Sequence, residues 1–205
     1  MPTSPTDAPA WYLAYGSNLQ RERFACYLAG GQPPDALRTY VGCRDTTLPT
    51  RWAPMTVPGG LVFAGESPVW GGGVAVYDPA GDSEVAGRAY LLTHGQLSDV
   101  VAQETRQDPG VDRDLVSGIA GGSGLYDAVV PLGHREGAPV FTLGSRRRQV
   151  PTTPRPAYLR RVVLGLVETF GWGPEECADY LARAAGVRPA WTASALRALH
   201  PANAQ

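Results

Sequence analysis

Near the N-terminus the chain reads Tyr12-Leu13-Ala14-Tyr15-Gly16-Ser17-Asn18-Leu19, and the fold can be predicted outward from this segment. The aromatic and apolar run from Trp11 to Tyr15 ends at Gly16, which is the pattern of a buried strand bounded by a glycine. A helix is expected to follow at once and to stop at Gly30 and Gly31. The chain is therefore expected to begin with a strand, a tight turn and a helix.

The turn after Tyr15 has the features of an anion-binding corner. Gly16 lets the chain reverse tightly, Ser17 and Asn18 add polar side chains, and the first N–H groups of the next helix lack partners within it. Such a corner can hold a carboxylate or a developing oxyanion. The alternative interpretation is that Ser17 and Asn18 only cap the helix, and the pattern alone leaves both open.

A second feature is Glu104, which lies on the apolar face of an expected helix. The segment Thr93-His94-Gly95-Gln96 has capping-box spacing, and the stripe of Leu97, Val100 and Val101 follows it. Glu104 falls on the same face as this stripe, where partial burial raises the pKa of a carboxyl and suits it to general acid and base chemistry. The alternative is a side chain whose stem covers apolar surface while its carboxylate reaches water.

The rest of the chain alternates short strands with a few helices. Further strands are expected at Arg38–Cys43, Leu61–Ala64, Gly73–Tyr77, Val85–Leu92, and in a hairpin of Tyr126–His134 with Ala138–Leu143. A long loop is expected over 108–124, and helices over 156–170, 174–185 and 192–199. This order predicts an α+β fold with helices around a small curved or closed sheet.

Composition narrows the classes of function. The chain has 205 residues, 43% of them hydrophobic, which suits one domain, and its formal net charge of -1 gives no field that would favour nucleic acid or an anionic membrane surface. It contains no apolar run long enough to span a bilayer, and its first residues lack the pattern of a secretion signal. We therefore expect a cytoplasmic protein with a small-molecule partner.

The metal-binding and nucleophilic residue types form no recognisable site. The three cysteines and three histidines have no metal-ligand spacing, so no metal and no disulfide are expected. Gly16-Ser17-Asn18 lacks the pattern of a serine hydrolase, and Gly71-Gly72-Gly73 lacks the lysine of a phosphate-binding loop. Tyr126, Tyr158 and Trp70 are candidates for pocket walls, although each alone is more typical of a core or a turn.

Taken in order, these segments resemble the γ-glutamyl cyclotransferase superfamily. The matching segments are Tyr12 to Leu19, Trp70-Gly71-Gly72-Gly73-Val74-Ala75, Gln103-Glu104, Gly124-Leu125-Tyr126 and Pro156-Ala157-Tyr158-Leu159. They extend over residues 11–170. The resemblance implies a domain at 11–170 built on a small mixed or antiparallel β-barrel flanked by helices. Residues 171–205 would be a helical extension of it, and 1–10 a flexible leader.

The resemblance also implies a reaction and a set of site residues. The α-amine of a γ-glutamyl group attacks its own side-chain amide carbonyl and releases 5-oxoproline, with Glu104 as general acid and base and with no metal or cofactor. The residues implied in substrate binding are Tyr12, Leu13, Ala14, Tyr15, Gly16, Ser17, Asn18, Tyr126 and Tyr158. Alternatives are a catalytically silent module that binds a glutamyl-like ligand, or a related amide hydrolase. The sequence leaves the leaving group and the oligomeric state open.

Overall fold

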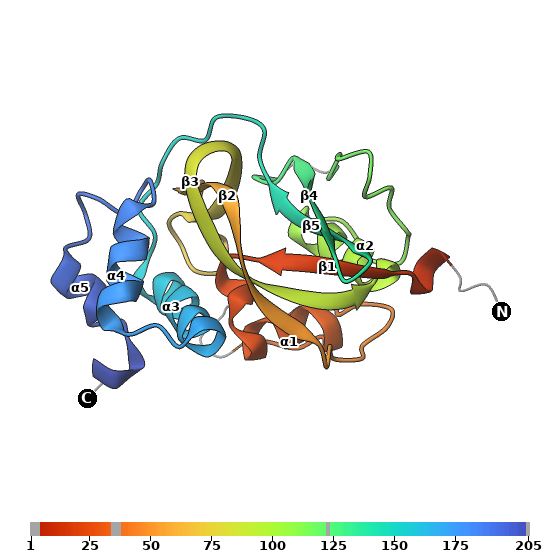
Figure 1. The fold of residues 1–205 in the computed structure, drawn as a ribbon, viewed down its shortest axis with the longest axis horizontal. Coiled ribbons are helices and arrows are strands. Elements are labelled where there is room, and N and C mark those ends of the chain that lie inside the picture. Colours follow the sequence, from red (N-terminus) through yellow and green to blue (C-terminus); the bar gives the residue numbers. More distant parts are fainter. Residues whose placement is uncertain (1–4, 34–37, 122–123, 204–205) are drawn as a thin grey trace.

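The strand before Gly16 lies in the middle of a five-stranded sheet, seen in a computed structural model that describes residues 5–33, 38–121 and 124–203 (Figure 1). The strands are β1 (Pro9–Ala14), β2 (Trp52–Ala64), β3 (Val74–Thr93), β4 (Ala128–Arg135) and β5 (Ala138–Gly144). Across the sheet the order is β2-β3-β1-β5-β4, with β1 and β5 parallel and the other neighbours antiparallel. Because β3 also pairs with β5 through Tyr77 and Gly144, the sheet curls into a half-barrel.

The long strand β3 lets the sheet curl. Its residues 74–78 and 83–90 pair with β2, while 88–93 also pair with β1. The prediction of two separate strands, Gly73–Tyr77 and Val85–Leu92, is wrong because the turn-forming residues 79–82 are accommodated as an irregularity opposite Gly59 and Gly60 of β2. Gly59 has φ 141°, and a Cβ there would lie 2.4 Å from the ring of Tyr77.

Three other predicted segments also differ from the structure. Leu61–Ala64 is only the end of the longer β2, and Arg38–Cys43 is no strand, since Tyr40 makes a single bridge to Gly31. Within the predicted leader, residues 1–4 lie outside the described part. Residues 9 and 10 already belong to β1, and Pro5–Asp7 form a 3-10 turn.

The helices cover both faces of the curled sheet. They are α1 (Arg21–Ala29), α2 (His94–Glu104), α3 (Pro156–Phe170), α4 (Pro174–Arg183) and α5 (Ala193–Arg197). α3 has its predicted bounds, with Pro156 at its first turn and Gly171 in the left-handed conformation at φ 69° after its end. α1 starts later than predicted, because Ser17–Leu19 form a separate 3-10 turn before it.

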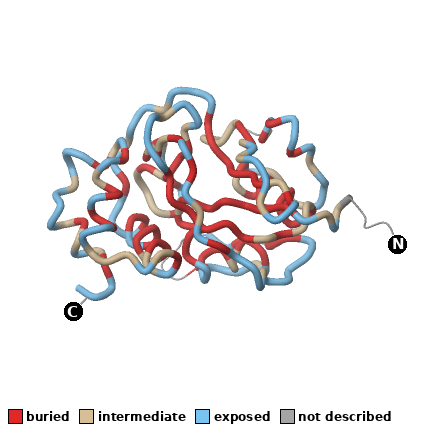
Figure 2. Tube along the Cα trace, viewed as in Figure 1, coloured by how far each residue is buried: buried red, intermediate tan, exposed pale blue. Residues whose placement is uncertain are grey.

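Two clusters of buried side chains form the core, and Figure 2 shows buried chain running through the sheet and its flanking helices. One cluster joins the sheet to α3 and the C-terminal helices, and the other joins it to α1 and α2. The Tyr180 hydroxyl accepts a hydrogen bond from Ala86 N at 3.1 Å, and Leu181 and Leu196 are fully buried. The extension after residue 170 therefore packs against the sheet.

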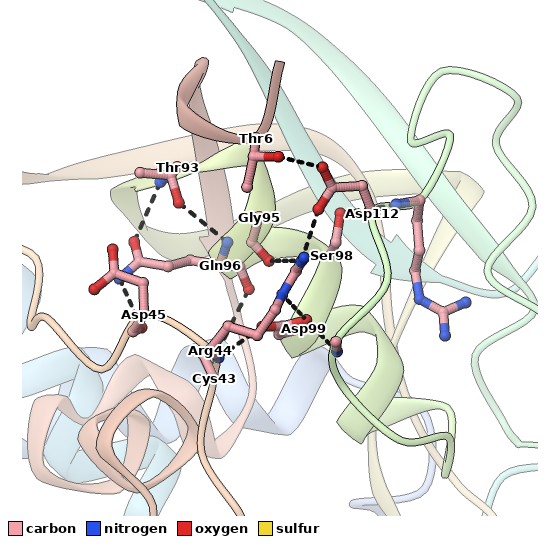
Figure 3. A network of polar contacts seen from close by, with 12 residues as sticks. Thr6, Cys43, Arg44, Asp45, Thr93, Gly95, Gln96, Ser98, Asp99 and Asp112 are labelled. Atoms are coloured by element: carbon pink, nitrogen blue, oxygen red, sulfur yellow. Dashed lines mark hydrogen bonds and ion pairs between the residues drawn. The ribbon is translucent and has the colours of Figure 1, made fainter. Parts of the chain in front are cut away.

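A polar network fastens α2 to the segments around it (Figure 3). Buried Asp99 accepts hydrogen bonds from Arg44 N at 2.8 Å, Arg44 Nε at 3.0 Å and Gly110 N at 2.9 Å. Asp112 accepts from Arg44 Nη2 at 2.7 Å and from the Thr6 hydroxyl at 2.5 Å. The network thus ties the N-terminal turn and the loop after α2 to the helix that carries Glu104.

The capping box of α2 provides a test of how local sequence stabilises this helix. Thr93 Oγ1 accepts from Gln96 N at 3.1 Å, and Gln96 Oε1 accepts from Thr93 N at 3.2 Å, as predicted. We expect Thr93→Ala to lower the free energy of unfolding by about 1 kcal/mol, because it removes one of these bonds. Urea denaturation measures the change. Thr93→Ser keeps the acceptor oxygen and is the control; an equal loss in both variants would contradict a role for the cap.

Candidate active site

The turn after Tyr15 and the end of α2 meet in the folded chain. Asn18 Nδ2 donates a hydrogen bond to Glu104 Oε1 at 2.8 Å, although the two residues are 86 positions apart. Neither Ser17 nor Asn18 makes a capping bond to α1, whose N-cap is Gln20. The interpretation of this turn as a mere helix cap is therefore wrong, and its amide side chain contacts the carboxylate that the sequence singled out.

Glu104 is the last residue of α2 and is half-buried. Removal from water is the largest effect on its carboxyl and raises the pKa above the ordinary value, while Arg23 and hydrogen bonds with Tyr27 and Asn18 act in the opposite direction. The net effect is a carboxyl whose pKa is raised above its ordinary value. A desolvated carboxyl of this kind is a candidate for taking up and returning a proton.

Three tyrosines, the buried Tyr15 and Tyr158 and the half-buried Tyr126, are fixed beside this pair by hydrogen bonds to β3 and β5. The Tyr158 hydroxyl accepts from Ala75 N at 2.9 Å, and the Tyr126 hydroxyl donates to Ala75 O at 2.9 Å. The Tyr15 hydroxyl donates to Leu143 O at 2.6 Å. Burial raises the pKa of Tyr158 to about 12 and also raises the pKa of Tyr15 and of Tyr126 well above the ordinary value, so all three hydroxyls stay protonated at neutral pH.

These groups line one cavity of about 120 Å³. Of the residues predicted for the site, those on the cavity are Tyr12, Tyr15, Gly16, Ser17, Asn18, Glu104, Tyr126 and Tyr158. Leu13 and Ala14 do not line it and are corrections to the prediction. Because side chains alternate along a strand, Leu13 packs into one core cluster and Ala14 into the other.

The glycines after Trp70 serve packing, whereas Trp70 itself lines the cavity. Gly73 N donates to Thr153 O at 3.0 Å, and a Cβ on Gly73 would lie 2.2 Å from Thr152 O. Because Gly73 has no side chain, Thr152 and Thr153, which precede α3, can lie against the residues at the start of β3. This close approach helps to bring Tyr158 to the cavity.

Sequence reasoning missed a basic part of the same cavity. Arg23 is only 3% exposed and lies between two rings, 4.8 Å from the centroid of Tyr27 and 4.5 Å from that of Tyr40. Arg38 and Arg106 also line the cavity. Arg23 and Tyr27 are four positions apart and therefore lie on one face of the helix. This spacing was the one sequence feature that could have indicated contact between the guanidinium and the ring.

Three further features of the described residues concern metal-binding groups, cysteines and membrane-spanning helices. Among them, no group of three or more His, Cys, Asp or Glu side chains is placed to hold a metal ion. Cys26, Cys43 and Cys177 are free thiols. In this part of the chain, no helix has the length and apolar character needed to cross a membrane.

The raised pKa of Glu104 predicts how stability depends on pH. A carboxyl whose pKa is higher in the folded state favours folding while it is protonated, and this contribution is lost as pH rises through the folded-state pKa. We expect the unfolding free energy of Glu104→Gln, relative to the native chain, to increase between pH 4 and pH 8. Denaturation at several pH values measures it. Glu84→Gln, at an exposed position of β3, is the control; an identical trend in both variants would contradict a desolvated Glu104.

Comparison with known proteins identifies the fold. No family model matches the chain. A solved structure named γ-glutamyl cyclotransferase superposes with a TM-score of 0.51 at 19% identity, covering 79% of this chain and 80% of its own. An uncharacterized protein from Homo sapiens gives the same TM-score at 20% identity and the same coverage. The chain therefore has the γ-glutamyl cyclotransferase-like α+β fold, as the resemblance of its ordered segments implied.

A curated relative shares sequence with this chain. It is named histone deacetylase 5, from Arabidopsis thaliana, and is 30% identical over 200 residues, which cover 85% of this chain. The chain spans only 30% of the length of that relative. The similarity therefore concerns one part of the plant protein.

Proposed function

We propose that this chain is a γ-glutamyl cyclotransferase-type enzyme that releases 5-oxoproline from a γ-glutamyl amine, amide or dipeptide. The observation that carries the proposal is the hydrogen bond between Asn18 and Glu104, made inside a cavity walled by buried tyrosines. This hydrogen bond connects the desolvated carboxyl of Glu104 to the turn at Gly16 to Asn18, which has the features of an anion-binding site. The likeness of the fold to γ-glutamyl cyclotransferase supports the same reaction class.

The proposed reaction is an intramolecular acyl transfer. The α-amine nitrogen of the glutamyl group attacks the γ-carbonyl carbon, a new C–N bond closes the five-membered lactam, and the bond from that carbon to the leaving nitrogen breaks. Glu104 takes the proton from the attacking amine and delivers it to the leaving amine, so the carboxylate is regenerated. No water is consumed, and the products together contain every atom of the substrate.

Holding the substrate in attack geometry supplies much of the expected catalysis, because nucleophile and electrophile belong to the same molecule. The proposed role of the turn from Tyr15 to Asn18 is to bind the glutamyl carboxylate or to polarise the carbonyl through backbone N–H groups. Tyr126 and Tyr158 are proposed to wall the glutamyl group. The reaction so written needs neither a metal nor a cofactor, and its partner is a small molecule.

The proposal is tested by incubating the purified chain with a panel of γ-glutamyl dipeptides and γ-glutamyl amines and identifying products by mass spectrometry. Formation of 5-oxoproline with release of the free amine supports it. Free glutamate instead of the lactam would indicate an amide hydrolase. Tight binding of 5-oxoproline without turnover of any substrate would indicate a binding module of the same fold.

A further inference from the structure

Four buried polar atoms on the cavity have no hydrogen-bond partner among the described residues. They are Arg23 Nε, Arg23 Nη1, Asn18 Oδ1 and Gln103 Oε1. A buried polar atom without a partner destabilises the fold, and a charged one does so more strongly, so such atoms gathered on one cavity indicate a ligand that pairs with them. This ligand must offer acceptors to the guanidinium and donors to the two amide oxygens.

The guanidinium of Arg23 is held in place. The rings of Tyr27 and Tyr40 enclose it, and its Nη2 donates to the Tyr40 hydroxyl at 2.5 Å. Tyr27 in turn accepts a hydrogen bond at its backbone oxygen from Gln103 Nε2 at 2.9 Å, which fixes Gln103 beside it. The unpaired donors of Arg23 are therefore pre-organised for an acceptor group, and a carboxylate is the natural partner of a guanidinium.

Two groups of side chains line the cavity, each connected by its own contacts. Tyr15, Tyr126 and Tyr158 are bonded to residues 75–77 of β3 or to β5. Arg23 and its two enclosing rings form the other group, which also includes Arg38, 5.1 Å from the ring centroid of Tyr40. Glu104 interacts electrostatically with members of both groups. Glu104 and both groups line the same cavity.

We propose that Arg23 is a specificity-determining residue that binds a carboxylate on the leaving half of the substrate. This inference rests on the proposed function, in which the glutamyl half occupies the tyrosine-lined part beside the turn and Glu104 acts at the scissile amide. The leaving amine then points into the basic part, where Arg38 and Arg106 add positive charge. Among γ-glutamyl compounds, the substrate selected is one whose leaving amine carries a carboxylate, as an amino acid does.

The test compares two substrates that differ only in that carboxylate, γ-glutamyl-alanine and γ-glutamylethylamine. We expect the native chain to show a higher kcat/KM for γ-glutamyl-alanine by at least about tenfold, and Arg23→Gln to lower this value about 30–100-fold, because a charge-assisted contact is lost. Because Arg23 also lowers the pKa of Glu104, Arg23→Gln should lower kcat/KM for γ-glutamylethylamine as well, but by a factor at least about tenfold smaller than for γ-glutamyl-alanine. Arg23→Lys keeps the charge and should recover part of the preference. Arg21→Gln, at an exposed position of the same helix, is the matched control.

Loss of both activities by the same factor in Arg23→Gln and in Arg23→Lys would overturn the inference, because Arg23 would then serve only Glu104 or the glutamyl half. Equal use of the two substrates by the native chain would overturn it as well. Calorimetric binding of both compounds to Glu104→Gln separates this inference from the proposed function. If no lactam forms from any γ-glutamyl compound, yet γ-glutamyl-alanine binds at least about tenfold tighter in an Arg23-dependent manner, the inference stands and the proposed function fails.

Discussion

Glu104→Gln is expected to lower kcat/KM for lactam formation about 10²–10⁴-fold, which is the usual contribution of a positioned general acid and base. The amide keeps the size of the side chain and an oxygen that can accept from Asn18 Nδ2, so the cavity should retain its shape. It cannot take the proton from the attacking amine. Steady-state kinetics by mass-spectrometric detection of 5-oxoproline measures the effect.

The control for this variant is Glu84→Gln, which removes the same charge at an exposed position of β3. Circular dichroism and thermal unfolding establish that both variants are folded. Unchanged turnover by folded Glu104→Gln would rule out proton transfer by this residue.

Gly165→Ala is expected to destabilise the chain, although alanine is the better helix former. Gly165 lies in α3, where a Cβ would be 2.3 Å from Leu19 Cβ and 2.7 Å from Gln20 N. Overpacking of this kind costs about 1–3 kcal/mol, and more where backbone must move, against a gain of about 1 kcal/mol in helix propensity. We expect a net loss of about 2 kcal/mol in the free energy of unfolding, measured by urea denaturation.

The same substitution should also weaken activity, because it pushes α3 away from the turn that precedes α1. Tyr158 is carried by α3, and its hydroxyl would lie 2.9 Å from a Cβ built on Gly16, so these elements are in close contact. Arg160→Ala, on the exposed face of the same helix, is the control and should change stability by less than about 0.5 kcal/mol. A stability gain in Gly165→Ala would contradict the close packing of α3 on this turn.

Local sequence signals predicted those elements whose bounds are set by their own residues. α3 has an apolar stripe, a proline at its start and a glycine after its end, and the structure reproduces its bounds. The capping box before α2 is equally local. The segments 73–77 and 85–92 were misjudged because pairing with β2 keeps the intervening turn-forming residues within one ladder, and no local pattern reports that pairing.

The residues of the candidate site were also predictable where the signal was local, but their contacts were not. The turn at Gly16 to Asn18 and the carboxylate of Glu104 were each visible, but their contact joins residues 86 positions apart and depends on how α2 packs beside β1. Arg23 was overlooked because an arginine in a short helix ordinarily faces water. Its burial requires Tyr40, which comes from a segment without regular structure.

Product analysis in water enriched with ¹⁸O distinguishes attack by the α-amine from attack by water, using a γ-glutamyl substrate on which the chain shows turnover. Intramolecular attack by the α-amine predicts 5-oxoproline without ¹⁸O and one equivalent of released amine. Glutamate carrying one ¹⁸O atom in its side-chain carboxyl would contradict intramolecular attack, because water and not the amine would then be the nucleophile.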